Sequence, residues 1–249
     1  MPKLSVLIIT LNEEKNICRC LESVKWADEI IVIDSDSQDQ TVKIAIEYTD
    51  KIFIEKWQGF AATKNFGLEK TSGEWILWID ADEEVPVELA EEIQESIKSG
   101  DFEGYQIPRK ANFLGRWIKH SGWYPGYVLR LIKRDFAHFP GKSVHEYLEP
   151  PSKTGKLNTP ILHYTDPNIN HYFMKLNRYT SLAAEELIGK DKKFHFSDLL
   201  FRPLHITLKM YILKLGFLDG FQGFLLAVFS GYYVFIKYAK LWELQKRNG

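Results

Sequence analysis

Hydrophobic positions in the first hundred residues form short apolar runs that alternate with amphipathic stretches. The runs lie at residues 4–10, 29–33, 51–54 and 75–80. Runs of this length, rich in Ile, Val and Trp, are typical of strands buried on both faces of a parallel sheet. The stretches between them predict helices from Asn12, as N-cap, to about Val24, at Thr41–Tyr48 and at Gly59–Glu69. This alternation predicts a doubly wound α/β sheet with flanking helices.

The pattern changes after residue 100. Gly104–Pro108 predicts another strand, and Val128–Arg134, which alternates apolar and basic residues, predicts an antiparallel strand at the sheet edge. From about residue 168 the pattern is helical, with segments predicted at residues 170–188, 199–215 and 220–236. We therefore expect an α/β domain at residues 1–165 and a C-terminal helical extension at residues 166–249.

Composition excludes several classes of function. The 249 residues carry a formal net charge of -1, which gives no indication of nucleic-acid binding. Cys18 and Cys20 have no second pair to complete a zinc site and are expected to be reduced thiols. We expect no signal peptide, because the N-terminus leads directly into a strand. The glycine-rich signatures of dinucleotide-binding enzymes and P-loop NTPases are missing from the sequence.

Asp80 and Asp82 directly follow the most apolar run, Trp75–Ile79. Ligands bind at the carboxyl ends of strands in open α/β sheets. Side chains two positions apart on an extended segment point the same way, so both carboxylates are expected to face one point. Such a pair suits Mg²⁺ or Mn²⁺, which take hard oxygen ligands and substrate phosphates.

Four segments together resemble family 2 glycosyltransferases, which have the GT-A nucleotide-sugar fold. The matching segments are Ser5–Glu13, Ile31–Thr41, Lys64–Gly67 and Trp75–Glu83. This order and spacing cover roughly the first hundred residues. The sequence departs from the family at Asp36, where glycine is common, and Asp39 is expected to cap the following helix.

The resemblance implies roles for individual residues at the nucleotide-sugar site. The implied donor-binding residues are Thr10, Glu13, Asp34, Lys64 and Asp80, and the implied metal ligands are Asp82, Asp80 and His145. Asp34 would accept a hydrogen bond from the uracil N–H, and Lys64 would approach the diphosphate. Asp82 is expected to be the better metal ligand, and the implied cofactor is a divalent cation, Mg²⁺ or Mn²⁺.

Residues 110–127 combine aromatic and basic side chains, which suit sugar rings and phosphorylated acceptors. The alternative is an amphipathic surface segment packed on the sheet. His120–Pro125, Leu129–Leu131 and Val144–Glu146 resemble the acceptor half of the lipopolysaccharide core glucosyltransferases. This resemblance implies that His120, Trp123 and Arg130 contact the acceptor.

The resemblance implies an inverting reaction, in which a base removes the proton of an acceptor hydroxyl. We expect Glu146 to be this base, with Asp135 as the weaker candidate. His145 is the expected additional metal ligand, or else orients a phosphate. Basic side chains and the cation would stabilise the leaving nucleotide diphosphate.

The uncharged run at residues 220–236 is followed by Lys237 and Lys240. We interpret the C-terminal helices as interfacial helices on an anionic membrane surface. A marginal transmembrane span and a buried helical pair or oligomer contact remain alternatives, since a span needs about 20 apolar residues.

The sequence therefore predicts a metal-dependent, inverting glycosyltransferase that moves a sugar, with UDP-glucose the expected donor, to a lipopolysaccharide core or similar glycolipid. We expect it to be peripheral on the cytoplasmic face of the inner membrane and to have no nucleic-acid partner. A polyprenyl-phosphate sugar transferase and a catalytically silent carbohydrate- or membrane-binding module are the alternatives. The sequence leaves open the donor sugar, the linkage, the preferred metal and whether the chain forms a homo-oligomer.

Overall fold

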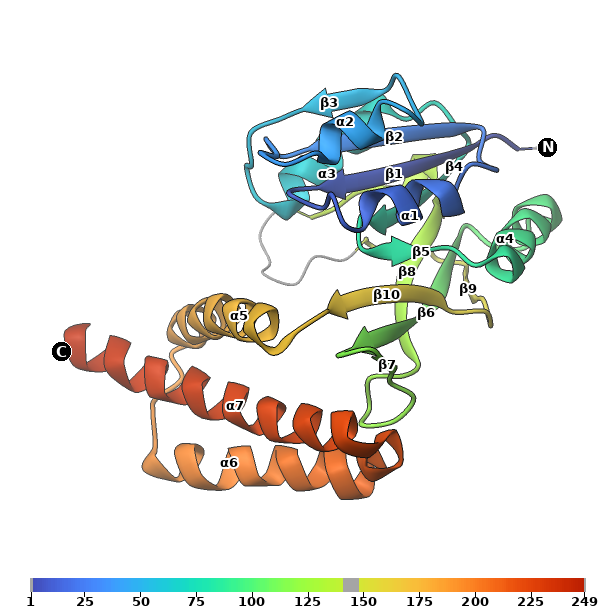
Figure 1. The fold of residues 1–249 in the computed structure, drawn as a ribbon. Coiled ribbons are helices and arrows are strands. Elements are labelled where there is room, and N and C mark those ends of the chain that lie inside the picture. The colour runs from blue at the N-terminus through green and yellow to red at the C-terminus, as the bar shows by residue number, and fades with distance from the viewer. Residues whose placement is uncertain (1, 141–147, 249) are drawn as a thin grey trace. The chain divides into compact units, whose positions relative to one another are not determined.

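The computed structural model describes residues 2–140 and 148–248 (Figure 1). The chain forms two compact units, and each has its own hydrophobic core. The first unit consists of Met1–Arg109 and Gly126–His163, and the second of Lys110–Pro125 and Tyr164–Gly249. The segment with His120 and Trp123 therefore belongs to the same unit as the C-terminal helices.

The first unit is built on a sheet with the strand order β3-β2-β1-β4-β8-β6. Its elements are β1 (Leu4–Thr10), α1 (Ile17–Ser23), β2 (Glu29–Asp34), α2 (Thr41–Ala45), β3 (Ile52–Ile54), α3 (Phe60–Lys70), β4 (Trp75–Asp80), β5 (Glu83–Glu84), α4 (Val87–Ser99), β8 (Gly126–Lys133), the 3-10 turn η1 (Arg134–Phe136) and β9 (Thr154–Lys156). Two strands cross the boundary between the units, β6 (Gly104–Phe113) and β10 (Ile161–Asp166). The β3-β2-β1-β4 half is parallel, as predicted, and β8 pairs antiparallel with both β4 and β6.

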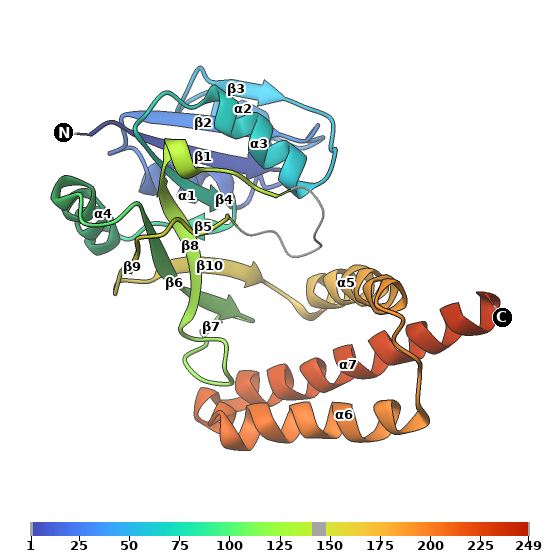
Figure 2. The same cartoon turned by 180° about the vertical axis from the view of Figure 1, so that it is seen from behind.

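The parallel strands are buried on both faces, which explains their continuous apolar runs. In β1, Val6 and Ile8 pack into the core beneath α1, α2 and α4, while Leu7 belongs to the core of the opposite face. Residues of α3 pack against that second core. Figures 1 and 2, which view the chain from opposite sides, show α1 in front of the sheet in one and α3 in the other.

Some predicted boundaries were wrong. α1 begins at Ile17, not at Asn12, because Asn12 has a positive φ of 55° and hydrogen-bonds to the loop after β2. β8 is an interior strand between β4 and β6, not an edge strand. Its alternating basic residues misled the prediction, because Arg130 is buried. α4 was not predicted, although its apolar residues Leu89, Ile93 and Ile97 follow helical spacing.

The second unit is mainly helical. Its elements are β7 (Arg116–Trp117), α5 (Ile169–Gly189), α6 (Phe196–Leu208), the π-helical turn η2 (Lys209–Leu213), the 3-10 turn η3 (Gly216–Asp219) and α7 (Gly220–Asn248). Figures 1 and 2 both show α6 and α7 side by side. Gly231 permits this close packing, because a Cβ there would lie 2.2 Å from Thr207 Oγ1. The predicted helix at residues 170–188 is confirmed, and Asn168 caps it by accepting the His171 N–H at 2.9 Å.

Glu29 at the start of β2 ties four segments of the first unit together. Its carboxylate accepts hydrogen bonds from the Ser5 hydroxyl, from Lys51 Nζ, and from the Ser72 N–H and hydroxyl. Burial alone would raise the pKa of Glu29, but these donors outweigh it and lower the pKa to about 2. The ionised form therefore stabilises the fold.

We predict that Glu29 makes the free energy of unfolding dependent on pH. Because its pKa is depressed in the folded state, its contribution of about 3 kcal/mol is present above pH 4.5 and is lost as the pH falls toward 2. Urea unfolding of the wild type and of Glu29→Gln between pH 7 and pH 3 measures this. The difference in unfolding free energy should shrink as the pH falls, and a constant difference would contradict the assignment.

Candidate functional site

The loops that follow β1 and β2 are joined by hydrogen bonds at the carboxyl ends of these strands. The bonds run from Ser35 N to Thr10 O (2.9 Å), Asn12 N to Ser37 Oγ (2.7 Å), Glu13 N to Thr41 Oγ1 (2.8 Å) and Glu14 N to Asp39 Oδ2 (3.1 Å). Asp39 also accepts the Thr41 N–H at the first residue of α2, but it lies one position before the N-cap, which is Gln40 and not the predicted Asp39. The two loops therefore form one connected edge beside β4.

The three residues predicted to line the nucleoside pocket lie on this edge. Asp34 is fully buried, and its carboxylate accepts the N–H and hydroxyl of Ser37 at 2.8 and 2.6 Å. Glu13 accepts a hydrogen bond from Asn16 Nδ2 at 2.7 Å. Thr10 is 5% exposed, and its Oγ1 has no hydrogen-bond partner among the described residues. The structure thus brings Thr10, Glu13 and Asp34 together.

At the end of β4, Asp80 forms an ionic cluster with Arg130 of β8 and Glu83 of β5. Arg130 Nη2 donates to Asp80 Oδ2 at 2.9 Å and to Glu83 Oε1 at 2.6 Å. The Asp80 N–H donates to Glu83 Oε2 at 3.0 Å. The Glu83 carboxylate therefore binds both the Arg130 guanidinium and the backbone of Asp80. The side chains of Arg130 and Glu83 are 1% and 0% exposed, whereas that of Asp80 is 32% exposed.

The two carboxyl groups of this cluster differ in pKa. Desolvation opposes ionisation of Asp80, but the charges of Arg130 and then Lys64 hold its pKa well below its usual range. For Glu83, burial is the largest effect and raises the pKa, with Arg130 acting against it. Asp80 therefore presents a carboxylate to solvent.

Two basic side chains, those of Arg130 and Lys64, pack on the ring of Trp78. Arg130 Cζ lies 3.7 Å, and Lys64 Nζ 4.0 Å, from the centre of the Trp78 ring. The indole N–H donates to the Leu129 carbonyl at 2.8 Å, which fixes the ring against β8. Cation–π contacts of this kind hold the two basic groups in place, and both groups lower the pKa of Asp80.

Asp82 contacts a histidine that the sequence analysis did not identify. His163 Nε2 lies 3.2 Å from Asp82 Oδ2, and the two side chains are 13% and 16% exposed. β10 pairs antiparallel with β5 through His163 and Glu83, and this register brings His163 to the acidic segment. Eighty-one positions separate the two residues. The only local signal was a histidine within a short β-pattern, which is too weak to assign a role.

Two of the predicted site residues lie outside the described part of the chain. These are Glu146, the predicted base, and His145, a predicted metal ligand. Within residues 2–140 and 148–248, no group of three or more His, Cys, Asp or Glu side chains is arranged to hold a metal ion. Among the described residues near the end of β4, Asp82 and His163 form a close pair of possible metal ligands.

The three residues predicted to bind the acceptor are dispersed. Arg130 is buried against Asp80 and Glu83, so its environment is that of the carboxylate cluster and not of an exposed acceptor surface. His120 and Trp123 belong to the second unit. Asp219 Oδ1 lies 3.0 Å from His120 Nδ1, and Trp123 packs edge-on against Phe113.

We predict that removal of Arg130 destabilises the fold through the carboxylates it leaves behind. Arg130→Met should lose about 3–5 kcal/mol of unfolding free energy, because Glu83 remains buried without a counter-charge. Adding Glu83→Gln should recover part of this loss. Urea unfolding of both single variants and the double variant measures the coupling. Lys133→Met, at a half-buried position on the same strand, is the control. Additive effects of Arg130→Met and Glu83→Gln on the unfolding free energy would contradict the cluster.

Comparisons with known proteins agree with this geometry. The model of the family described as glycosyl transferase family 2 matches residues 5–148. The lipopolysaccharide core biosynthesis glycosyltransferase LpsC of Rhizobium meliloti is 31% identical over 253 residues, covering 98% of this chain and 94% of LpsC. An uncharacterised glycosyltransferase of Rickettsia typhi is 32% identical over 261 residues, covering 100% of this chain and 89% of the relative.

Two solved structures share the fold. TarS 1–349 of S. aureus in complex with UDP-GlcNAc gives a TM-score of 0.54 at 17% identity, covering 99% of this chain and 92% of that one. The mannosyltransferase PcManGT of Pyrobaculum calidifontis with GDP-Man and Mn²⁺ gives 0.55 at 13% identity, covering 96% and 87%. Together with the match of the family model, they show a GT-A fold, and the chain is a glycosyltransferase that belongs to glycosyl transferase family 2.

Proposed function

We propose that this glycosyltransferase transfers a sugar from a nucleotide-sugar donor, with inversion and with a divalent cation, to a lipopolysaccharide core or similar glycolipid. The arrangement of Asp80 and Asp82 at the end of β4 carries the proposal, because Asp80 is fixed on Arg130 while Asp82 faces His163. Asp80 is thus paired with Arg130, whereas Asp82 is available to bind a metal cation.

Asp82 and His163 fit a metal site. A carboxylate oxygen and an imidazole nitrogen are both ligands that Mn²⁺ accepts, so Asp82 and His163 would hold the cation together. The observed separation of Asp82 Oδ2 and His163 Nε2 is 3.2 Å. Diphosphate oxygens of the donor would complete the ligand set, and the cation would then neutralise charge on the leaving diphosphate. His163 is thus a further proposed metal ligand, and His145, which lies outside the described residues, keeps its proposed role.

The donor would lie along the edge formed by the loops after β1 and β2. Thr10 Oγ1 and Asp34 would face the nucleoside, and Lys64 would support the diphosphate as a point charge. Thr10 Oγ1 and Arg130 Nη1 are among the buried polar atoms of the described chain that have no hydrogen-bond partner, and a bound donor would supply partners to both. UDP-glucose is the donor we propose. TarS in complex with UDP-GlcNAc and PcManGT with GDP-Man make UDP and GDP the two nucleotides to compare.

The acceptor assignment rests on the similarity to LpsC over nearly the whole of both chains. We propose that Glu146 removes the proton from the acceptor hydroxyl, whose oxygen then attacks the anomeric carbon as the nucleotide diphosphate leaves. His120 and Trp123 would contact the acceptor. A cytosolic donor and a lipid-borne acceptor meet at the cytoplasmic face of the inner membrane, which is the location we propose.

We predict that UDP with Mn²⁺ or Mg²⁺ raises the Tm. Ligand at a hundred times its Kd stabilises by about 2.7 kcal/mol, which is about 5–10 °C for a chain of this size. Asp82→Ala and His163→Ala should each abolish the metal-dependent part of the shift. Thermal unfolding with UDP or GDP, with and without metal, measures it.

His138→Ala is the matched control for that experiment, because His138 is an exposed histidine of the same unit. It should keep the full metal-dependent shift. No shift with either nucleotide would contradict the donor site, and an unchanged shift in His163→Ala would remove that residue from the metal site.

We predict that Glu146→Gln abolishes sugar transfer but leaves donor binding intact. An amide cannot take the acceptor proton, whereas the nucleotide and metal are held by other residues. Transfer is measured as release of UDP in the presence of acceptor, and donor binding as the Tm shift. Near-normal transfer by this variant would show that another group, with Asp135 the first candidate, is the base.

A further inference from the structure

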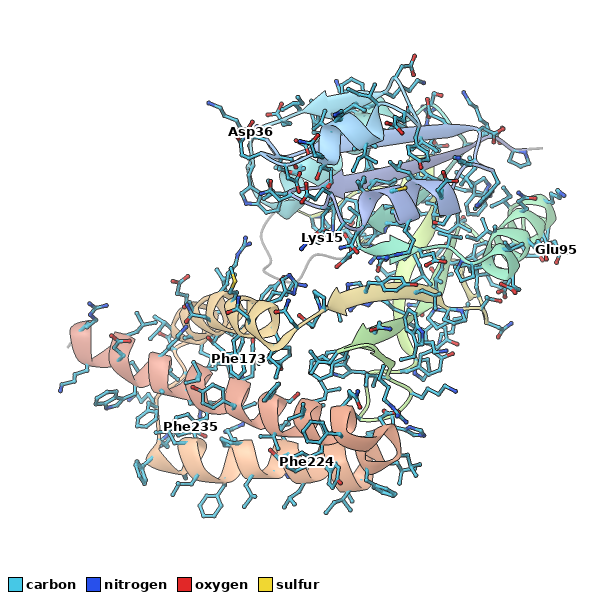
Figure 3. The ribbon with its side chains drawn as sticks, in the orientation of Figure 1. Lys15, Asp36, Glu95, Phe173, Phe224 and Phe235 are labelled. Carbon is cyan, nitrogen blue, oxygen red and sulfur yellow. The ribbon has the colours of Figure 1, made fainter. Side chains whose placement is uncertain are left out.

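Two adjacent helices of the second unit carry exposed apolar stripes. On α6 and η2 the exposed side chains recur every four residues, at Phe196, Leu200, Leu204, Leu208 and Ile212. On α7 they recur every three or four residues, at Phe221, Phe224, Val228, Tyr232 and Phe235. Figure 3 shows Phe224 and Phe235 along α7 beside α6. We call these two stripes, together with Phe201 and the connecting residues 213–218, the apolar face.

The charges of this region are arranged asymmetrically. Within the described stretch 196–242 the carboxylates are Asp198 and Asp219, and both are buried, at 5% and 2% exposure. Asp198 accepts a hydrogen bond from Arg202, and Asp219 bonds to His120. Arg202, Lys209 and Lys214 are exposed. The surface of this stretch is therefore apolar and basic, without an exposed carboxylate.

The packing of α7 indicates that this helix lies on a surface and does not cross a membrane. In the part of the chain that the structure describes, one helical segment, Gly216–Arg247, is long and apolar enough to span, and its most apolar window of 18 residues has a mean hydropathy of 1.3. However, Leu226, Tyr238 and Leu241 on its other sides are buried in the cores of the second unit.

The last third of α7 carries a lysine that is bound within the second unit. Lys240 Nζ donates to Asn177 Oδ1, Thr180 Oγ1 and Ser181 Oγ of α5 at 2.8–2.9 Å. Only a stripe of α7 is free for lipid, whereas a spanning helix would be apolar all round.

We infer that the apolar face docks flat on an anionic lipid surface. Exposed aromatic and aliphatic side chains along two adjacent helices suit the boundary between headgroups and acyl chains. Lys209 and Lys214 would meet the lipid phosphates, and the internalised carboxylates would spare the contact any repulsion. The role of this docking, to hold the enzyme on the surface that contains its acceptor, rests on the proposed function. Binding to lipid does not itself require sugar transfer.

Co-sedimentation of the full chain with phosphatidylcholine vesicles, with and without phosphatidylglycerol, tests this. The wild type should bind the anionic vesicles preferentially, and salt should weaken binding. Phe201→Gln with Leu213→Gln should weaken it by at least about tenfold, because these side chains are 69% and 73% exposed and would be buried in lipid. Lys209→Gln and Lys214→Gln should each weaken it by about fivefold.

The matched control is Ile46→Gln with Val87→Gln, which removes two apolar side chains of the first unit that are 64% and 71% exposed. It should bind vesicles as the wild type does, and every variant should keep its Tm and its UDP-dependent shift. Equal binding by the Phe201/Leu213 variant, or no preference for anionic vesicles, would overturn the inference.

Light scattering tests the alternative that a second copy of the chain, and not lipid, covers the apolar face. A wild-type oligomer that dissociates in the Phe201/Leu213 variant, without vesicle binding by either protein, would overturn the inference in favour of a second copy of the chain. Vesicle binding without any nucleotide-dependent shift would leave the docking face standing and refute the proposed function alone.

Discussion

A buried guanidinium is the constraint on which the site depends. Arg130 lies on an interior strand, where an uncompensated charge would cost several kcal/mol. Glu83 and Asp80 share the compensation, because Arg130 Nη2 donates to both carboxylates, and Glu83 also accepts the Asp80 N–H. The end of β4 is therefore held in place by the same contacts that neutralise Arg130. Asp80 can remain ionised and partly exposed without having to neutralise the cluster alone.

This arrangement gives the two carboxylates of the Asp-Ala-Asp segment different environments. Asp80 faces a cation that the protein supplies, and its position is set by β8. Asp82 faces an imidazole, and imidazole nitrogens are common metal ligands. Residues two apart on one strand end are thus distinguished by what the neighbouring strands β8 and β10 bring to them.

The parts of the fold that could be predicted are those determined by residues close together in the sequence. Strands buried on both faces need continuous apolar runs, and β1 and β4 were found for that reason. Pairing between distant strands leaves no such trace. Arg130 appeared to be an exposed basic residue of an edge strand, and His163 was not singled out, because the partners of both residues are set by strand register. That the ends of β1, β2 and β4 carry polar and acidic residues was predictable from motif order, but the identity of the group beside Asp82 was not.

In the second unit, the buried carboxylates of Asp198 and Asp219 affect both the stability of the fold and the charge of the surface. Asp219 accepts the His120 N–H at 2.8 Å and also contacts the imidazole, so it anchors the residue 119–120 segment to the turn before α7. Asp198 holds Arg202 in the same helix and contacts Lys192. Each of these contacts stabilises the fold, and each also removes a negative charge from the neighbourhood of the exposed apolar stripes. A substitution that released either carboxylate would therefore be expected to alter both stability and surface charge, so the two properties are coupled through the same hydrogen bonds.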